Sequence, residues 1–143
     1  LASMWAKIGL KVTVNSMPRA QYFPKVLSFD TSACLVGWGS TTLDAYRPLQ
    51  SLSATYDAAT GDGISNVGRA SNAELDALLK RLAVSEDVKE REGLAREALA
   101  VEKREVLHIP LLEPQISWVM KKSVDAPLRP DNTLVLDRVR VNE

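Results

Sequence analysis

One short run of uninterrupted apolar residues, Ala-Cys-Leu-Val-Gly-Trp at 33–38, constrains the fold most strongly. Runs of this length are typical of strands buried on both faces, as in parallel sheets. A second strand is predicted at 10–14, where apolar and polar residues alternate. Apolar helical stripes over 1–8 and 18–29 precede these two strands, with short joints between them. The order helix–strand–helix–strand predicts right-handed βαβ connectivity. The fold class expected is therefore α/β, a mostly parallel sheet flanked by helices.

The middle of the chain is predicted to be helical. Ser71-Asn72-Ala73-Glu74 has the pattern of a capping box, with Ser71 at the N-cap. A second helix is predicted from residue 85, and a short one within 43–52 of the polar segment 39–71. The apolar side chains expected to face the core are Leu75, Leu78, Leu79 and Leu82 on the first helix, and Val88, Ala95, Ala98, Leu99 and Val106 on the second. Loose alternation at 109–120 indicates a further strand.

Length, charge and cysteine content exclude several classes of protein. The 143 residues fit one domain, and 18 basic residues balance 18 acidic ones, so the basic excess typical of nucleic-acid binders is missing. The single cysteine, Cys34, excludes an internal disulfide and is expected to be a small core residue. No apolar run approaches the roughly 20 residues that span a bilayer. The chain begins without Met inside a predicted helix, so we expect a piece of a longer protein.

Catalytic and metal-binding patterns are weak. His108 is the only histidine, and no Gly-x-Ser-x-Gly turn surrounds a serine. One cysteine and one distant histidine do not suggest a zinc site, and no phosphate-binding glycine motif follows a strand. We therefore predict no catalytic residue, no metal and no cofactor. Two alternatives stay open: a small α/β hydrolase or transferase that uses His108, and an interaction module that uses the charged helix at 85–107.

The carboxyl end of the strand at 33–38 is the best candidate for a ligand site. Ligands of open α/β sheets bind beyond the carboxyl ends of the strands. Trp38 stands there between two glycines, followed by polar residues, and the neighbouring strand leads to a second polar cluster. The alternative is that Trp38 fills the core, where tryptophan is often found. The predicted ligand-binding residues are Trp38, Gly39, Ser40, Thr41, Asp44, Arg19 and Tyr22.

Four segments in register resemble one protein family, the family-5 solute-binding proteins of ABC transporters. Residues 4–12, Met-Trp-Ala-Lys-Ile-Gly-Leu-Lys-Val, resemble that family's "LxKIGIKV" segment. Gly37-Trp38-Gly39 with Asp44 resembles its strand-end "GW…D" segment. Residues 66–78 resemble "NxGRYSNPEVDALL", and 108–111 resemble the "xIPLY" strand.

The resemblance implies a periplasmic binding protein type II-like lobe that is incomplete at its amino terminus. Residues 1–126 would form part of the carboxy-terminal lobe, and 127–143 would be a tail that returns to a missing first lobe. The family captures a small-molecule or peptide solute between two lobes and delivers it to ABC permease subunits. It works in the periplasm or as a lipoprotein outside the cytoplasmic membrane.

Three departures from the family pattern concern the solute. The peptide-binding members that this chain resembles have an Asp three residues after the tryptophan, whereas this chain has Thr41 there. Arg19 stands where some peptide binders have an aromatic residue, and Ala70 replaces a tyrosine. These departures argue against an ordinary dipeptide, and Thr41, Ser40 and Arg19 would suit a neutral or anionic solute better.

Overall fold

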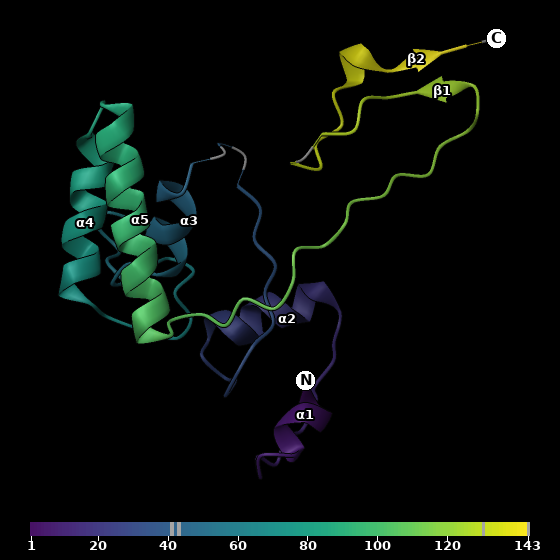
Figure 1. Cartoon of the computed structure of the whole chain (residues 1–143). Coiled ribbons are helices and arrows are strands. Elements are labelled where there is room, and N and C mark those ends of the chain that lie inside the picture. Colours follow the sequence, from purple (N-terminus) through teal and green to yellow (C-terminus); the bar gives the residue numbers. More distant parts are fainter. Residues whose placement is uncertain (41, 43, 130, 143) are drawn as a thin grey trace. The chain divides into compact units, whose positions relative to one another are not determined.

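The computed structural model describes residues 1–40, 42, 44–129 and 131–142, which divide into two compact units, Leu1–Val36 and Gly37–Glu143. Each unit is described by itself. The first contains helices α1 (Ala2–Ala6) and α2 (Arg19–Leu27), as Figure 1 shows. The elements of the second unit are α3 (Tyr46–Leu52), α4 (Ala73–Val84), α5 (Val88–Glu105), β1 (Val124–Asp125), a 3-10 turn (Leu136–Arg138) and β2 (Arg140–Val141).

The first unit is held by its turns and by one tyrosine. Gly9, predicted to follow the helix directly, has φ of 83°, a backbone conformation that suits glycine, but α1 itself ends at Ala6, two residues earlier than predicted. The hydroxyl of Tyr22 on α2 donates to the carbonyl of Leu35 at 2.8 Å and accepts from its amide at 3.0 Å. Tyr22 therefore ties α2 to the segment expected to form a strand.

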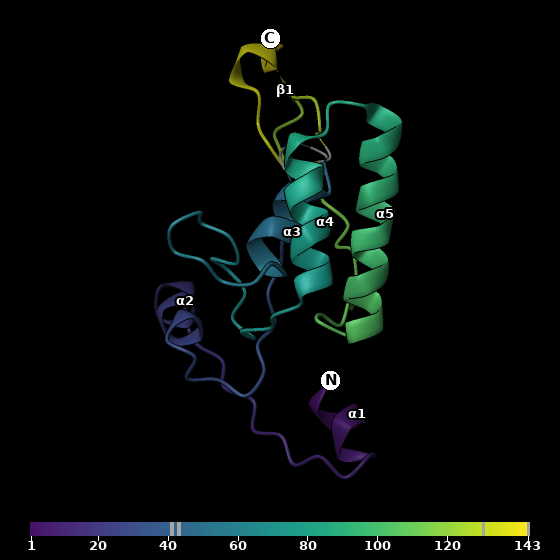
Figure 2. The same cartoon turned by 90° about the vertical axis from the view of Figure 1, so that its left-hand side faces the viewer.

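The core of the second unit lies between three helices. Helices α4 and α5 lie side by side, joined by a short turn, and α3 packs on α4 (Figures 1 and 2). The leucine stripe predicted for α4 is confirmed, because all four of its leucines are buried. Its members pack with residues of α3, α5 and the loop after α3; the cluster is Leu49, Ala54, Leu75, Leu78, Leu79, Leu82, Leu94, Ala98 and Val101.

The helix starts differ slightly from the prediction. Asn72, and not Ser71, caps α4, with its side-chain oxygen accepting from the amide of Leu75 at 3.0 Å. Ser71 instead hydrogen-bonds the hydroxyl of Thr55 at 2.9 Å. Asp87 caps α5 by accepting from the amide of Glu90 at 2.8 Å. Both caps satisfy amides that a helix start leaves without an intrahelical partner.

The core-facing side of α5 was predicted only in part. Ala98 is buried and Ala95 packs against the core, but Val88, Leu99 and Val106 are exposed. The buried stripe is Leu94, Ala98 and Val101, with i, i+4, i+7 spacing. The residue spacing alone is compatible with burial of either the predicted face or the face of Leu94, Ala98 and Val101. Contact with α4 determines which face is buried.

The expected parallel sheet is not found among the described residues. The sheet present there is antiparallel and two-stranded, with Val124 opposite Val141 and Asp125 opposite Arg140. Residues 10–14, 33–38 and 109–120 are not strands, because a strand must be hydrogen-bonded to a neighbouring strand and the structure shows no such pairing for these segments. Leu35 is consequently 67% exposed, and Cys34, expected in the core, is half-buried.

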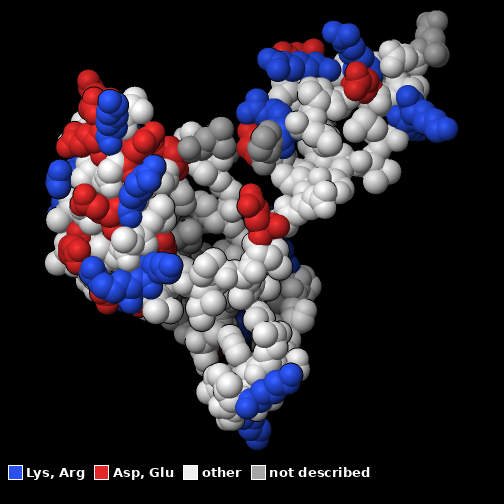
Figure 3. Space-filling model, in the orientation of Figure 1, with Lys and Arg blue, Asp and Glu red and all other residues white. Residues whose placement is uncertain are grey.

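The surface of α4 and α5 carries both signs of charge. Acidic and basic side chains are interleaved over these helices in Figure 3. Such mixing is typical of a solvated helical face rather than of a surface for one highly charged partner. In the part of the chain that the structure describes, no helix is long and apolar enough to cross a membrane.

The leucine stripe of α4 can be tested by truncation. Leu75 is fully buried, at 0% exposed, whereas Val84 on the same helix is 78% exposed. Leu75→Ala is expected to lower the free energy of unfolding by about 2–5 kcal/mol, because it leaves a cavity. Val84→Ala is the control and should change it by less than about 0.5 kcal/mol. Urea unfolding followed by circular dichroism measures both, and equal effects would contradict the core described here.

Candidate ligand-binding pocket

A pocket of about 370 Å³ opens in the second unit around Trp38. Its lining residues are Trp38, Gly39, Ser40, Thr42 and Arg47. The Trp38 residue is 48% exposed, so its ring is not sealed in the core. A Cβ placed on Gly39 would meet no atom within 4 Å outside its chain neighbours, so the space at this glycine is open. Three of the predicted ligand residues therefore line one pocket, and Thr41 lies outside the described residues.

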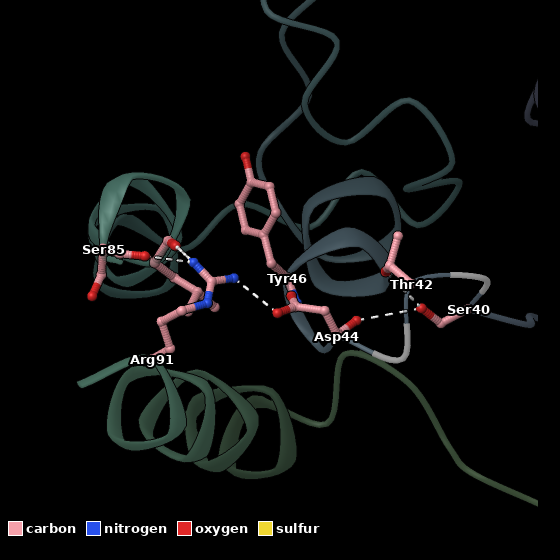
Figure 4. Close-up of polar contacts among 7 residues, drawn as sticks. Ser40, Thr42, Asp44, Tyr46, Ser85 and Arg91 are labelled. Carbon is pink, nitrogen blue, oxygen red and sulfur yellow. Dashed lines mark hydrogen bonds and ion pairs between the residues drawn. The ribbon is translucent and has the colours of Figure 1, made fainter. Parts of the chain in front are cut away.

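The polar turn beside Trp38 is organised by its own side chains. The hydroxyls of Ser40 and Thr42 lie 3.2 Å apart, and Ser40 also donates to the carbonyl of Asp44 at 3.4 Å. Figure 4 shows Ser40, Thr42 and Asp44 in this arrangement. Both hydroxyls can donate and accept, so they can reorient toward a bound solute.

The carboxylate of Asp44, predicted as a ligand residue, is bound by other residues of the protein. Its carboxylate accepts from the amide of Tyr46 at 2.7 Å and pairs with the guanidinium of Arg91 at 2.8 Å (Figure 4). Arg91 also donates to the carbonyls of Leu82 and Ser85. The hydrogen bond from Arg91 lowers the pKa of Asp44. Asp44 thus binds the first amide of α3 and, through Arg91, connects α3 to α4 and α5.

Arg47, on the first turn of α3, lines the pocket but was not among the predicted residues. Its guanidinium donates to the side-chain oxygen of Gln50 at 3.2 Å, one helical turn later. Gln50 in turn donates to the carboxylate of Asp62 at 2.8 Å. Sequence alone could have suggested Arg47 as a pocket residue, because it lies in the helix predicted within 43–52, next to the polar turn.

Arg19 and Tyr22, the other predicted ligand residues, belong to the first unit. Both lie on α2, where Arg19 sits over the ring of Phe23 at 5.3 Å. Tyr22 holds Leu35 as described above. Their membership of the same ligand site as Trp38 stays a prediction.

His108, the candidate of the enzyme alternative, belongs to a different arrangement. One carboxylate oxygen of Glu102 accepts from the hydroxyl of Ser53 at 2.8 Å and lies 2.9 Å from Nδ1 of His108. A serine nucleophile needs the histidine beside its hydroxyl, whereas here the carboxylate stands between the two. The hydrogen bond from His108, aided by Ser53, lowers the pKa of Glu102 against the opposing effect of burial. The trio fastens α5 to the end of α3.

A second pocket, of about 430 Å³, lies in the carboxy-terminal segment. Its lining is apolar: Trp118, Val119, Met120, Val124, Ala126, Leu134, Leu136 and Val139. The indole N–H of Trp118 donates to Asn132 at 2.8 Å and is already used. A polar solute would find few groups to orient it there, so the Trp38 pocket is the better candidate.

Comparisons with known proteins agree with the four sequence motifs. The chain is 29% identical over 120 residues to the di/tripeptide-binding protein 3 of Pseudomonas aeruginosa strain UCBPP-PA14. The dipeptide-binding protein of P. aeruginosa strain PAO1 matches equally, with 84% of this chain covered. The resemblance to family-5 solute-binding proteins is confirmed.

A further relative extends the same result. The di/tripeptide-binding protein 1 of P. aeruginosa strain UCBPP-PA14 is 27% identical over 124 residues, or 87% of this chain. The chain spans 22% of the length of each of these curated relatives. No protein-family model matches the chain. All three relatives are named as binding proteins.

The role of Asp44 can be tested by removing its charge. Asp44→Asn is expected to lower the free energy of unfolding by about 1 kcal/mol, a modest value because the Asp44 side chain is 38% exposed. Since the folded pKa is lowered, this contribution exists above the ordinary pKa of 3.8 and disappears as pH falls through the folded value. A double-mutant cycle with Arg91→Gln measures the coupling in urea unfolding. Purely additive effects would contradict the pair, and Arg96→Gln on the same helix is the control.

The Glu102 trio gives a separate pH dependence. Glu102→Gln is expected to destabilise the protein by about 1–2 kcal/mol near neutral pH, because its oxygen accepts two hydrogen bonds. Because the pKa of Glu102 is lowered in the folded protein, this stabilisation is fully present at pH values above the ordinary pKa of 4.5. It is lost as the pH falls through the folded pKa. Urea unfolding across this range measures it. Exposed Glu97→Gln on the same helix should show no such pH dependence, and an equal dependence in both variants would argue against the trio.

Proposed function

We propose that this chain is part of the substrate-binding component of an ABC importer that captures a small, peptide-like solute. The observation that carries the proposal is the pocket beside Trp38. Its ring, the following glycine and the hydroxyls of Ser40 and Thr42 line a space open to solvent. These residues come from the segment that resembles the family's strand-end "GW…D" motif. The similarity to three proteins named for dipeptide or di/tripeptide binding supports the same solute class.

The proposal assigns a place in a two-lobed protein. Residues 1–126 would contribute to the carboxy-terminal lobe, and 127–143 would pack on the first lobe. Exposed apolar side chains on extended segments support this, among them Leu10, Leu35 and Leu128. Exposed apolar area is unfavourable in water, so we expect these side chains to be covered by the first lobe in the full-length protein.

The partners and location follow from the same proposal. The solute would be held between the two lobes, and closure of the lobes would present it to ABC permease subunits. The protein would act outside the cytoplasmic membrane, in the periplasm or anchored there as a lipoprotein. Capture and delivery require no bond-making step, and the arrangement of Ser53, Glu102 and His108 offers no nucleophile–base pair.

The proposal predicts stabilisation of the full-length protein by peptides. A dipeptide at a hundred times its dissociation constant should raise the free energy of unfolding by about 2.7 kcal/mol. Differential scanning fluorimetry across dipeptides, tripeptides, opines and sugars measures the selectivity. Trp38→Ala should weaken the effect of any active peptide, whereas Trp118→Ala, in the apolar pocket, should leave it in place. A response to no peptide, or sensitivity to Trp118 alone, would refute the proposal.

A further inference from the structure

We propose that Arg47 sets the charge of the solute, by pairing with a carboxylate whose adjoining apolar part lies on Trp38. The inference rests on the proposed function and names the chemical group that its site selects. Among the lining residues that the structure describes, Arg47 is the ionisable one; the others are Trp38, Gly39, Ser40 and Thr42. The pocket therefore presents a positive charge with two hydroxyls and an indole ring.

No carboxylate of the described residues pairs directly with Arg47; Asp62 is separated from it by the side chain of Gln50. Asp44, three residues earlier, is the closest in sequence, but its carboxylate is paired with Arg91 and with the amide of Tyr46. The ion pairs found in the described parts of the chain do not include Arg47. Its positive charge is thus available to an anion that enters the pocket.

The guanidinium is held by a neutral partner that leaves donors over. Arg47 uses one N–H, on Nη1, for the side-chain oxygen of Gln50. The amide nitrogen of Gln50 donates to Asp62, which fixes the oxygen toward Arg47. Guanidinium has five N–H donors in a rigid fork, so enough remain for a two-point contact with a carboxylate.

The support behind Gln50 is itself tightly built. The amide of Gly63 donates to the backbone oxygen of Gln50 at 2.8 Å. Gly63 has φ of 60°, and a Cβ there would lie 2.4 Å from the backbone oxygen of Ala54. Only glycine fits, so the loop that carries Asp62 is held close to α3. Arg47 is positioned before any solute arrives, which lowers the entropy cost of binding.

Trp38 defines the part of the solute beside the anion. Its half-exposed ring offers an apolar face, and the Ser40 and Thr42 hydroxyls offer donors and acceptors on the adjoining turn. A cationic group would be repelled by Arg47, and an uncharged solute would leave it unused. The matching solute carries a carboxylate close to an apolar or aromatic group.

The test compares carboxylates with their amides on the full-length protein, by isothermal titration calorimetry. The probes are alanyl-phenylalanine, its carboxamide, and alanyl-glutamate carboxamide, whose only carboxylate is on the side chain. Free phenylpropionate is a fourth probe that contains no peptide bond. Wild type should bind alanyl-phenylalanine at least about tenfold more tightly than its carboxamide. Arg47→Gln should abolish that difference, Arg47→Lys should keep part of it, and Arg96→Gln, exposed on α5, should keep all of it.

The outcomes separate this inference from the proposed function. Strong binding of alanyl-glutamate carboxamide would assign the carboxylate to a side chain, and weak binding would assign it to the peptide terminus. Peptide binding that is indifferent to amidation, or unchanged in Arg47→Gln, would overturn the inference and leave the proposed function standing. Arg47-dependent binding of phenylpropionate without peptide binding would do the reverse. Binding of none of the four probes would overturn the inference, and would overturn the proposed function as well if no dipeptide or tripeptide stabilises the protein in the fluorimetry scan.

Discussion

The guanidinium of Arg91 is the contact on which the arrangement of the second unit depends. From α5 it reaches the carbonyls of Leu82 and Ser85 at the end of α4, and the carboxylate of Asp44 before α3. Three helices thus meet at one side chain. Because Asp44 also accepts from the amide of Tyr46, the turn that carries Trp38 is attached directly to the helical core. Charge-assisted hydrogen bonds of this kind are stronger than neutral ones and fix geometry as well as energy.

Helix α3 is fastened at both of its ends, which matters for the residue between them. Asp44 and Arg91 hold its start, and Ser53, capping its end, donates to Glu102 of α5. Leu49 anchors the face between these ends in the core. Arg47 therefore projects from a helix with little freedom to move. Sites built on rigid elements position their side chains more accurately than sites on loops.

The sequence predicts what depends on local spacing and misses what depends on a distant partner. The leucines of α4 follow a helical period that only one buried face can satisfy, so all four were correctly placed in the core. The N-cap of α4 is Asn72, one residue after the predicted Ser71, because either side chain can accept a hydrogen bond from a free amide at the helix start. The strand at 33–38 did not form among the described residues, since its pairing needs a neighbouring strand that local sequence does not specify.

The same distinction explains the site. Trp38, Gly39 and Ser40 adjoin one another in sequence, so their common pocket could be predicted from a strand end alone. Asp44 belongs to the same run, yet its carboxylate pairs with Arg91, 47 residues later. No local sequence pattern reveals this pairing. With Asp44 neutralised in this way, Arg47 sets the sign of the pocket. Arg19 and Thr41 had already favoured a neutral or anionic solute on the basis of the family pattern. Arg47 supports the anionic choice from geometry, independently of those two residues, because its charge lies at the pocket itself.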